Sequence, residues 1–458
     1  MNFKLNSLFI SLLLLLSTPA FADIPGIEAS GVNPLDKKTE FLNNHLIAFS
    51  EIKVNNETKK FIALIPDVGS KEIVVYEVNP STNKLTESAT FTENLHAPFY
   101  ITFDPSGLHL YGVSSTRNFV TQYTFDPVRK KYVSSDESKS TKLINTAFQT
   151  ACRDNYFFLF DYYRTIQFFP SENKAYITCE DKSSKLYVVG YQFDSKTGAL
   201  KIPDISLAKE DKQGAGESTK VKAKMPEMAG QNLVEVANPL AILMGPLGRY
   251  LYAIDHNNVW HQYKLSQNGH FELTGESFKT EITKIESMTF DPSGENVYVV
   301  ARDSAGGSII VQYKFDQSSG KLEKLNSVTI PKTDAQIKVR ARTHATYIQF
   351  APAGNYAYVL DRLNNLIYQY RVESKTGKLI ALNPAAFITC SIVRSLVFDS
   401  DPSRHYAYAA ASERKTLEPK PETRCEYSKY QGHDPYELHI DQLVVDPATG
   451  QLANFAPD

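Results

Sequence analysis

Phe290–Gly294 reads Phe-Asp-Pro-Ser-Gly, and Val297–Tyr298, Gln312–Phe315 (Gln-Tyr-Lys-Phe) and the turn Gln317–Gly320 follow it. Proline at the second position of a turn and glycine at the fourth suit a type I turn between two strands. The alternation of polar and apolar residues in Gln312–Phe315 indicates a third strand. The glycine turn then leads to a fourth. This stretch therefore predicts a four-stranded antiparallel meander.

The same unit recurs along the chain. Copies of the proline turn with its tyrosine lie at Phe103–Tyr111, Phe168–Tyr176, Gly245–Tyr252, Phe350–Tyr358 and Phe398–Tyr408. Copies of the polar-aromatic strand lie at Val75–Val78, Gln122–Phe125, Tyr191–Phe193, Gln262–Leu265, Gln369–Val372 and Gln442–Val445. Seven copies in one phase, about 45 to 75 residues apart, fit propeller blades and argue against two separate β-sandwiches. One such sheet cannot bury both faces alone, whereas a radial arrangement buries them all. The sequence predicts an all-β seven-bladed β-propeller of four-stranded antiparallel blades, forming a single domain over residues 23–458.

Residues 1–22 have the layout of a secretory signal peptide. Lys4 precedes the apolar run Leu8–Leu16, and Ala20–Ala22 forms a small-x-small cleavage site. The run is shorter than the ~20 apolar residues of a membrane span, and no later segment looks transmembrane. We expect a mature chain that begins at Asp23 and is periplasmic or secreted.

The net charge and the absence of known motifs argue against several classes of function. The formal net charge is −2, which suggests neither a nucleic-acid-binding surface nor an anchor for anionic membranes. The chain has no Gly-x-Ser-x-Gly elbow, phosphate loop, HExxH motif or calcium-loop spacing. We therefore expect no metal and no cofactor.

The repeats resemble those of the bacterial seven-bladed propeller lactonase family, whose namesake members are 6-phosphogluconolactonase-like. The resemblance rests on the Phe-Asp-Pro-Ser-Gly turns, the Gln-Tyr strands and the Thr-Gly turns, and it covers about residues 41 to 455. It implies metal-independent hydrolysis of a sugar lactone, or a descendant that has lost or changed that activity. Many members of the family are cytoplasmic. Export of this chain would therefore disfavour a phosphorylated sugar lactone as substrate.

Two stretches depart from the blade template. Residues 209–231 are polar and charged, and we expect a long loop there after blade three. Residues 413–437 are rich in proline and charge, and we expect an insertion in blade seven. Long insertions in compact domains are often functional or mobile.

The innermost strands carry a register that predicts a site. The innermost strands are aligned on the residue two before the turn proline, and blades one and seven on Phe49 and Phe398. Two residues earlier, every blade has an apolar residue: Ile47, Ile101, Ile166, Ile242, Met288, Ile348 and Leu396. Two residues earlier still, this pattern breaks at His45, Phe99, Arg164, Leu240, Glu286, Thr346 and Arg394. His96 and His344 lie nearby in blades two and six. Because an unpaired buried charge is costly, charges at this level need water, a partner or a ligand.

These residues suggest roles in lactone hydrolysis, which needs a base and a group that stabilises the oxyanion. Glu286 or His344 is the candidate base, while Arg164 and Arg394 are candidates to hold an anion, with His96 and His45 as further ligand-binding residues. Arg164, Glu286, Arg394 and His344 are expected to converge at the upper mouth of the channel. The alternative is that each charge is paired off at its own strand start.

The ends of the second strands supply another polar ring. It contains Asp67, Arg117, Glu180, Asp181, Asp255, His256, Arg302, Asp303, Asp361, Arg362, Glu413 and Arg414. Aspartate side chains often cap turn amides, and we interpret most of this ring in that way. Trp260 and His261, on the third strand of blade four, are expected to pack.

Two functions remain open, because a fold does not choose between them. The first is a hydrolase that acts on a small molecule, either a sugar lactone or a related carboxylate or phosphate. The second is a non-catalytic scaffold that binds a protein, peptide or glycan, for which the insertion at 413–437 would offer a surface.

The four cysteines generate a testable prediction. An even number in an exported chain indicates disulfides, and the repeat map places Cys152 and Cys179 in blade three and Cys390 and Cys425 in blade seven. We predict the pairs Cys152–Cys179 and Cys390–Cys425, each worth about 3–4 kcal/mol in the chain-entropy model. Non-reducing peptide mapping checks the pairing, and a link between the two blades would contradict it.

Overall fold

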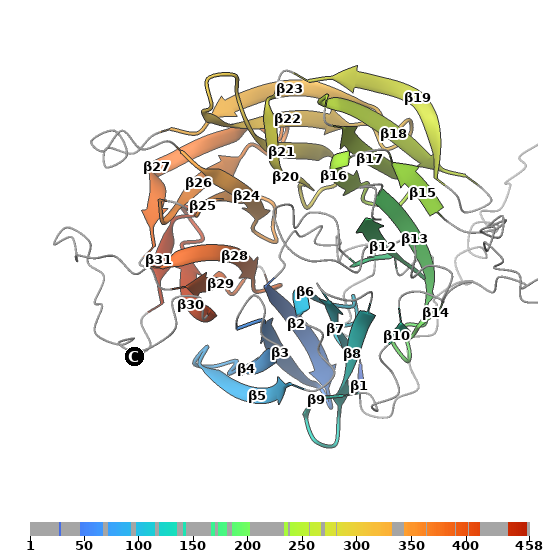
Figure 1. Cartoon of the computed structure of the whole chain (residues 1–458). Coiled ribbons are helices and arrows are strands. Elements are labelled where there is room, and N and C mark those ends of the chain that lie inside the picture. The colour runs from blue at the N-terminus through green and yellow to red at the C-terminus, as the bar shows by residue number, and fades with distance from the viewer. Residues whose placement is uncertain are drawn as a thin grey trace, which may run out of the picture.

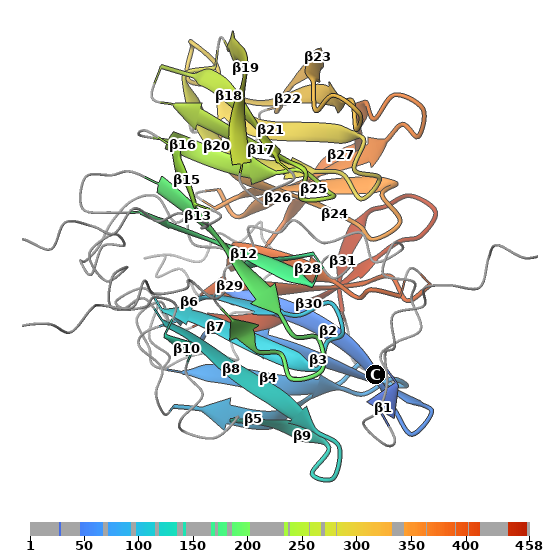
Figure 2. The ribbon, with the colours of Figure 1, turned by 90° about the vertical axis from the view of Figure 1, so that its right-hand side faces the viewer.

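The computed structural model describes seven antiparallel sheets arranged in a ring (Figure 1). Figure 2 shows the same sheets from the side, each twisted like a propeller blade. The part of the chain that the structure describes forms strands and contains no helix. It therefore holds no helix that could cross a membrane. The described residues are 27–28, 46–66, 72–92, 98–114, 119–134, 141–142, 166–169, 173–180, 186–201, 233–236, 239–255, 257–266, 271–280, 282–331, 343–362, 364–389, 391–401, 403–412 and 438–455.

Blades one to three have five strands each. Blade one contains β1 (Ile27–Glu28), β2 (Ile47–Val54), β3 (Glu57–Leu64), β4 (Ile73–Val78) and β5 (Leu85–Phe91). Blade two contains β6 (Pro98–Phe103), β7 (His109–Ser114), β8 (Phe119–Asp126), β9 (Lys131–Ser134) and β10 (Thr141–Lys142). Blade three contains β11 (Ile166–Phe169), β12 (Lys174–Glu180), β13 (Leu186–Phe193), β14 (Leu200–Lys201) and β15 (Leu233–Val236).

Blades four to seven have four strands each. Blade four contains β16 (Pro239–Met244), β17 (Tyr250–Asp255), β18 (Val259–Leu265) and β19 (Phe271–Lys279). Blade five contains β20 (Lys284–Phe290), β21 (Asn296–Arg302), β22 (Ser308–Phe315) and β23 (Leu322–Thr329). Blade six contains β24 (Ala345–Phe350), β25 (Tyr356–Asp361), β26 (Leu366–Val372) and β27 (Leu379–Ile388). Blade seven contains β28 (Ile392–Phe398), β29 (Tyr406–Ser412), β30 (Leu438–Val445) and β31 (Leu452–Asn454).

The predicted seven-bladed propeller is confirmed, with one correction to its third blade. The segments β14 and β15 both pair with β13, at opposite ends of that strand. The outermost strand of blade three therefore consists of two segments, β14 and β15, where the sequence predicted one strand. Blade two is built in the same way, because β9 and β10 both pair with β8.

The apolar level of the innermost strands forms the core between blades, as the period of two predicts. Ile47, Ile101, Met288, Ile348 and Leu396 are between 0% and 4% exposed. Clusters of such residues combine neighbouring blades, as where Met288 of blade five packs with Leu243 and Tyr252 of blade four. Each blade therefore buries its second face only against the next one.

The repeated tyrosine, glutamine and glycine form one lock between neighbouring blades. The hydroxyl of Tyr298 in β21 donates to the carbonyl of Gly377 in the outer turn of blade six, at 2.6 Å. Gln312 Nε2 in β22 donates to the same carbonyl at 2.6 Å. Burial raises the pKa of the Tyr298 hydroxyl, so it remains a donor. The same tyrosine bond joins Tyr111 to Gly198, Tyr252 to Gly320 and Tyr358 to Gly450.

The ring closes through side chains of blades seven and one. Lys60 Nζ lies 2.6 and 2.8 Å from the two carboxylate oxygens of Asp399, and both residues are 2% exposed. Tyr408 donates to Asn83 Oδ1 at 2.7 Å and stacks on Phe49. Asn83, at φ 55°, takes the position that glycine holds in the other locks. Among the described strands, none is shared between the two blades. Closure therefore depends on these side chains, on the apolar cluster that joins the two blades and on the backbone hydrogen bond from the Leu438 amide to the Pro66 carbonyl.

Several predictions lie outside the described residues. They are the signal peptide, the stretches 209–231 and 413–437, and the cysteines at 152, 390 and 425. Cys179 is described only by its backbone, which pairs with Tyr187 in blade three. The disulfide pairs therefore remain predictions.

The lock predicts the effect of a methyl group at its glycine. Gly377 has φ +68°, and an added Cβ would lie 2.7 Å from Asn296 Nδ2 and 2.8 Å from Tyr298 Oη. Gly275 has φ +82° with nothing within 4 Å of an added Cβ, so it is a matched control. We expect Gly275→Ala to cost roughly 1 kcal/mol from the backbone alone and Gly377→Ala about 2–4 kcal/mol. Chemical denaturation measures both, and equal losses would contradict the lock.

The closure pair predicts a pH-dependent variant. Burial raises the pKa of the Asp399 carboxyl, and its hydrogen bonds with Lys60 oppose that rise. Lys60→Met leaves a buried, unpaired carboxylate and should cost about 3–5 kcal/mol at neutral pH. Because a raised folded-state pKa favours proton binding by the native protein, this loss should shrink as the pH falls.

Denaturation curves for Lys60→Met and for Lys60→Met/Asp399→Leu check this. The double variant should recover much of the stability and lose the pH dependence of the single variant. A single variant that is as stable as the wild type at neutral pH would show that the pair does not hold the ring.

Candidate functional site

The break in the apolar register coincides with a β-bulge. In five innermost strands the pairing to the second strand skips one residue, and in each it is the residue at the break: Phe99, Leu240, Glu286, Thr346 or Arg394. The innermost strand of blade one, β2, pairs without a skip. A bulge re-aims the side chain of its extra residue. These residues therefore leave the alternation of the strand for a geometric reason.

In blades five and seven the bulge side chain meets the end of the second strand in its own blade. Glu286 Oε1 accepts from Arg302 Nε at 2.9 Å. Arg394 Nε donates to Ser412 Oγ at 3.3 Å. Both contacts lie at the end of the blade where the innermost strand begins and the second strand finishes, so this end carries the polar groups.

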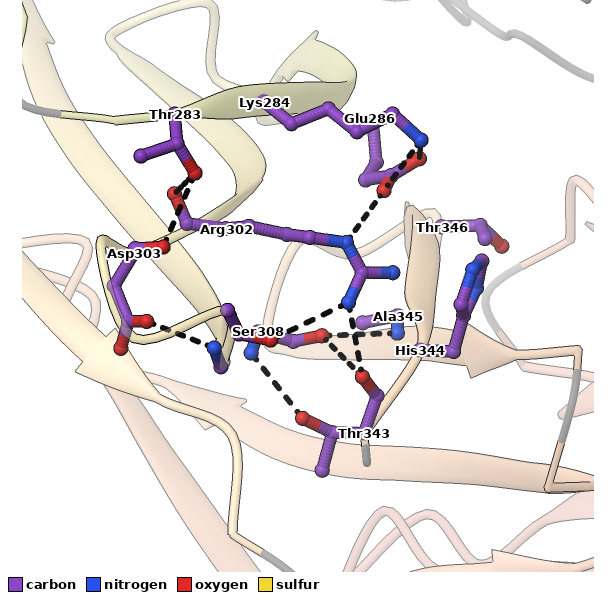
Figure 3. Close-up of polar contacts among 12 residues, drawn as sticks. Thr283, Lys284, Glu286, Arg302, Asp303, Ser308, Thr343, His344, Ala345 and Thr346 are labelled. Carbon is purple, nitrogen blue, oxygen red and sulfur yellow. Dashed lines mark hydrogen bonds and ion pairs between the residues drawn. The ribbon is translucent and has the colours of Figure 1, made fainter. Parts of the chain in front are cut away.

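Glu286 and Arg302 form a part-buried ion pair in blade five (Figure 3). Glu286 is only 4% exposed and also lies 3.0 Å from Lys284 Nζ. Arg302 reaches into blade six, where its Nη1 donates to the carbonyl of Thr343 at 3.3 Å. Its Nη2 has no hydrogen-bond partner within the described part of the chain. In Figure 3 the Nη2 side of the guanidinium faces Thr346 and His344 of blade six.

His344 is positioned by the backbone on both sides. Its amide donates to Asp361 Oδ2 at 2.8 Å. The preceding Thr343 and the following Ala345 are both tied to Ser308 of blade five, through hydrogen bonds of 3.1 and 3.2 Å. The ring itself is bound to no described residue, and Nδ1 is buried without a partner. An imidazole without fixed partners is suited to exchange a proton with a bound water or ligand.

Two arginines lie where blades six and seven meet. Arg362 follows β25 and donates from Nη2 to the carbonyl of Arg394 at 2.9 Å. Its Nε is buried and has no hydrogen-bond partner among the residues that the structure describes. Three arginines from blades five, six and seven therefore lie at this end of the blades, and Arg302 is paired with the Glu286 carboxylate.

The predicted site residues divide into three groups. Arg164, His96 and His45 lie outside the described residues. Glu286 and His344 lie at the junction of blades five and six, where Figure 3 shows them on either side of Arg302. Arg394 is tied to blade seven and Arg362, with no described contact to Glu286, so convergence of the predicted residues on one ligand remains a prediction.

The sequence pattern did not distinguish Arg302 and Arg362 from the turn-capping residues of the same ring. Turn capping holds for the aspartates of that ring, since Asp303 Oδ1 accepts the amides of Ala305 and Gly307. Turn capping does not describe Arg302 and Arg362, whose side chains donate to carbonyls of the next blade. A usable signal existed, because each arginine lies four residues after a repeat tyrosine.

The two residues of blade four that were expected to pack differ. Trp260 is buried and stacks on Phe278, as predicted. His261 instead is part-exposed and lies 3.2 Å from Asp255 Oδ2. No group of three or more metal-ligating side chains is placed to hold an ion in the described part of the molecule.

Comparison with known proteins supports the architecture. The family model described as "Lactonase, 7-bladed beta-propeller" matches residues 163–336. That stretch includes Arg164, Glu286 and Arg302 and ends before His344. No protein with a curated description matches the chain in sequence.

Solved structures share the fold at low identity. A candidate 6-phosphogluconolactonase of Bacteroides fragilis has a TM-score of 0.50 and 17% identity, covering 84% of this chain and 90% of its own. A candidate 6-phosphogluconolactonase of Bacteroides uniformis has the same TM-score and identity, covering 84% and 91%. A functionally unknown protein of Desulfotomaculum acetoxidans has a TM-score of 0.50 and 12% identity, covering 86% and 98%. Together with the matched repeats, these comparisons show that the chain has the seven-bladed β-propeller fold and that its residues 163–336 are similar to a lactonase family.

Proposed function

We propose that the junction of blades five and six binds a lactone or related small molecule and hydrolyses it, in an exported, periplasmic or secreted protein. One observation carries this proposal. The imidazole of His344, without partners among the described residues, faces a guanidinium whose Nη2 is also unbonded there. A base and a fixed cationic donor are the two groups that ester-type hydrolysis needs.

The contacts suggest a distinct task for each residue. His344 takes a proton from the attacking water, whose oxygen bonds to the carbonyl carbon of the lactone. The ring C–O bond then breaks, and His344 returns the proton to the leaving ring oxygen. Arg302 Nη2 donates to the carbonyl oxygen of the lactone and stabilises the negative charge that develops there. Glu286 is already bound by Arg302 and Lys284. It therefore serves better as the anchor of the guanidinium than as the base.

The family likeness supports the choice of substrate. The matched model is that of a lactonase family, and two similar structures carry the name 6-phosphogluconolactonase. Hydrolysis by the groups named above needs no metal, in line with the expectation from the sequence.

A non-catalytic scaffold that binds a protein, peptide or glycan remains the second candidate. The observation that favours it is the bonding of Glu286 and Arg394 inside their own blades, which is how structural polar groups are satisfied.

A lactone assay tests the proposal. Purified protein is assayed with a panel of neutral and acidic lactones, including glucono-δ-lactone, and the spontaneous rate is subtracted. His344→Gln and Arg302→Gln should each lower kcat by roughly 100-fold or more. Glu286→Gln should lower it less, because Arg302 keeps its bonds to blade six.

Lys314→Gln is the matched control, since the pair Lys314–Glu295 is exposed and belongs to the opposite end of the same blade. Its rate should equal that of the wild type. If the folded wild type hydrolyses no lactone above the spontaneous rate, the scaffold becomes the better interpretation.

A further inference from the structure

Arg302 and Arg362 are equivalent residues in consecutive repeats. Each lies four residues after the tyrosine that locks its blade to the next one, Tyr298 in blade five and Tyr358 in blade six. Each also donates to a backbone carbonyl of the following blade. The two blades therefore present a guanidinium at the same level and in the same way.

The two arginines differ in charge compensation. Arg302 has the carboxylate of Glu286 at 2.9 Å. Arg362 is half-buried and has no carboxylate within 4 Å among the described residues. Its sequence neighbour Asp361 is engaged elsewhere, by the amide of His344 and by the side chain of Asn364.

The difference in charge compensation comes from the residue at the bulge of the innermost strand. Thr346 occupies in blade six the position that Glu286 occupies in blade five. Its hydroxyl donates to the carbonyl of Leu360 at 3.3 Å and offers Arg362 no charge. Within the described part of the chain, Arg362 Nε is consequently a buried donor without a partner. A half-buried cation that keeps an unsatisfied donor is costly unless something else supplies the anion.

We propose that Arg362 binds an oxyanion, either a carboxylate or a phosphate, in the place that the Glu286 carboxylate takes beside Arg302. The planar guanidinium can present two parallel N–H groups to such an anion, and Nε would be one of them. Blade seven adds the positive charge of Arg394, whose carbonyl Arg362 already binds.

This inference deepens the proposed function and rests on it for the remainder of the ligand. Blades five and six would contact the reacting group, while Arg362 would hold an acidic substituent at the junction with blade seven. The substrate class is then an anionic small molecule.

The experiment introduces a carboxylate beside Arg362 by substitution of Thr346. Thr346→Glu reproduces the blade-five pair, and Thr346→Gln is the matched uncharged control. The probes are inorganic phosphate and D-gluconate, with D-glucose as the uncharged reference, titrated by calorimetry at low ionic strength. Because the anion makes few contacts, we expect the wild type to bind one or both anions with a Kd of about 1 mM. We expect no binding of glucose.

Thr346→Glu should weaken anion binding at least tenfold and raise Tm, because the new carboxylate pairs with Arg362. Thr346→Gln should bind within about threefold of the wild type. Arg362→Gln should lose binding, and if that variant does not fold, Thr346→Glu alone decides. The anion that binds more tightly identifies the acidic group as phosphate or carboxylate.

Two outcomes overturn the inference: no anion binding by the wild type, or binding by Thr346→Glu that equals the wild type. Either result together with lactone hydrolysis that depends on His344 and Arg302 would leave the proposed function standing. Anion binding with the expected pattern but no hydrolysis would remove the proposed function and keep the anion site.

Discussion

The hydrogen bond from a tyrosine of one blade to a turn carbonyl of the next is the interaction on which the rest of the structure depends. A single meander leaves both faces of its sheet exposed, so the blades are stable only when each is held against its neighbours. Tyr298 and Gln312 meet at the carbonyl of Gly377, far from solvent. The glycine is needed because its neighbours leave no room for a Cβ and its backbone is left-handed.

That lock also places the polar end of the blades. The second strand that carries Tyr298 continues for four residues to Arg302, so fixing the tyrosine fixes where the guanidinium emerges. The bulge in the innermost strand then turns Glu286 toward it. A rigid seam and a local irregularity together hold a charged pair at the edge of an otherwise apolar core, which is the usual way in which scaffolds support functional groups.

Internal repetition provides a comparison within one molecule. Blades five and six share their backbone geometry and their arginine, yet among the described residues only the arginine of blade five has a carboxylate that neutralises it. Blade seven reverses the arrangement, with Arg394 on the bulge and Ser412 at the strand end. Since the three blades differ at these positions while their packing residues remain alike, the variation is concentrated where a ligand could be recognised and not in the core.

The sequence by itself determined the blade count, the turns and the buried level of the innermost strands. These features are local, because a Pro-Ser-Gly turn and an alternation of period two depend on residues a few positions apart. The repeat tyrosines could be located, but the bond that each one makes lies in the next blade.

Only the tertiary structure decided which charges meet. A break in the apolar register looks the same whether Glu286 faces a ligand or an arginine 16 residues away. The bulge that turns Glu286 toward Arg302 cannot be located from residue composition. Lys60 and Asp399, 339 residues apart, could be paired only once the ring was closed. Side chains find partners through space, and the distance between them is set by the packing of whole blades, which no local pattern encodes.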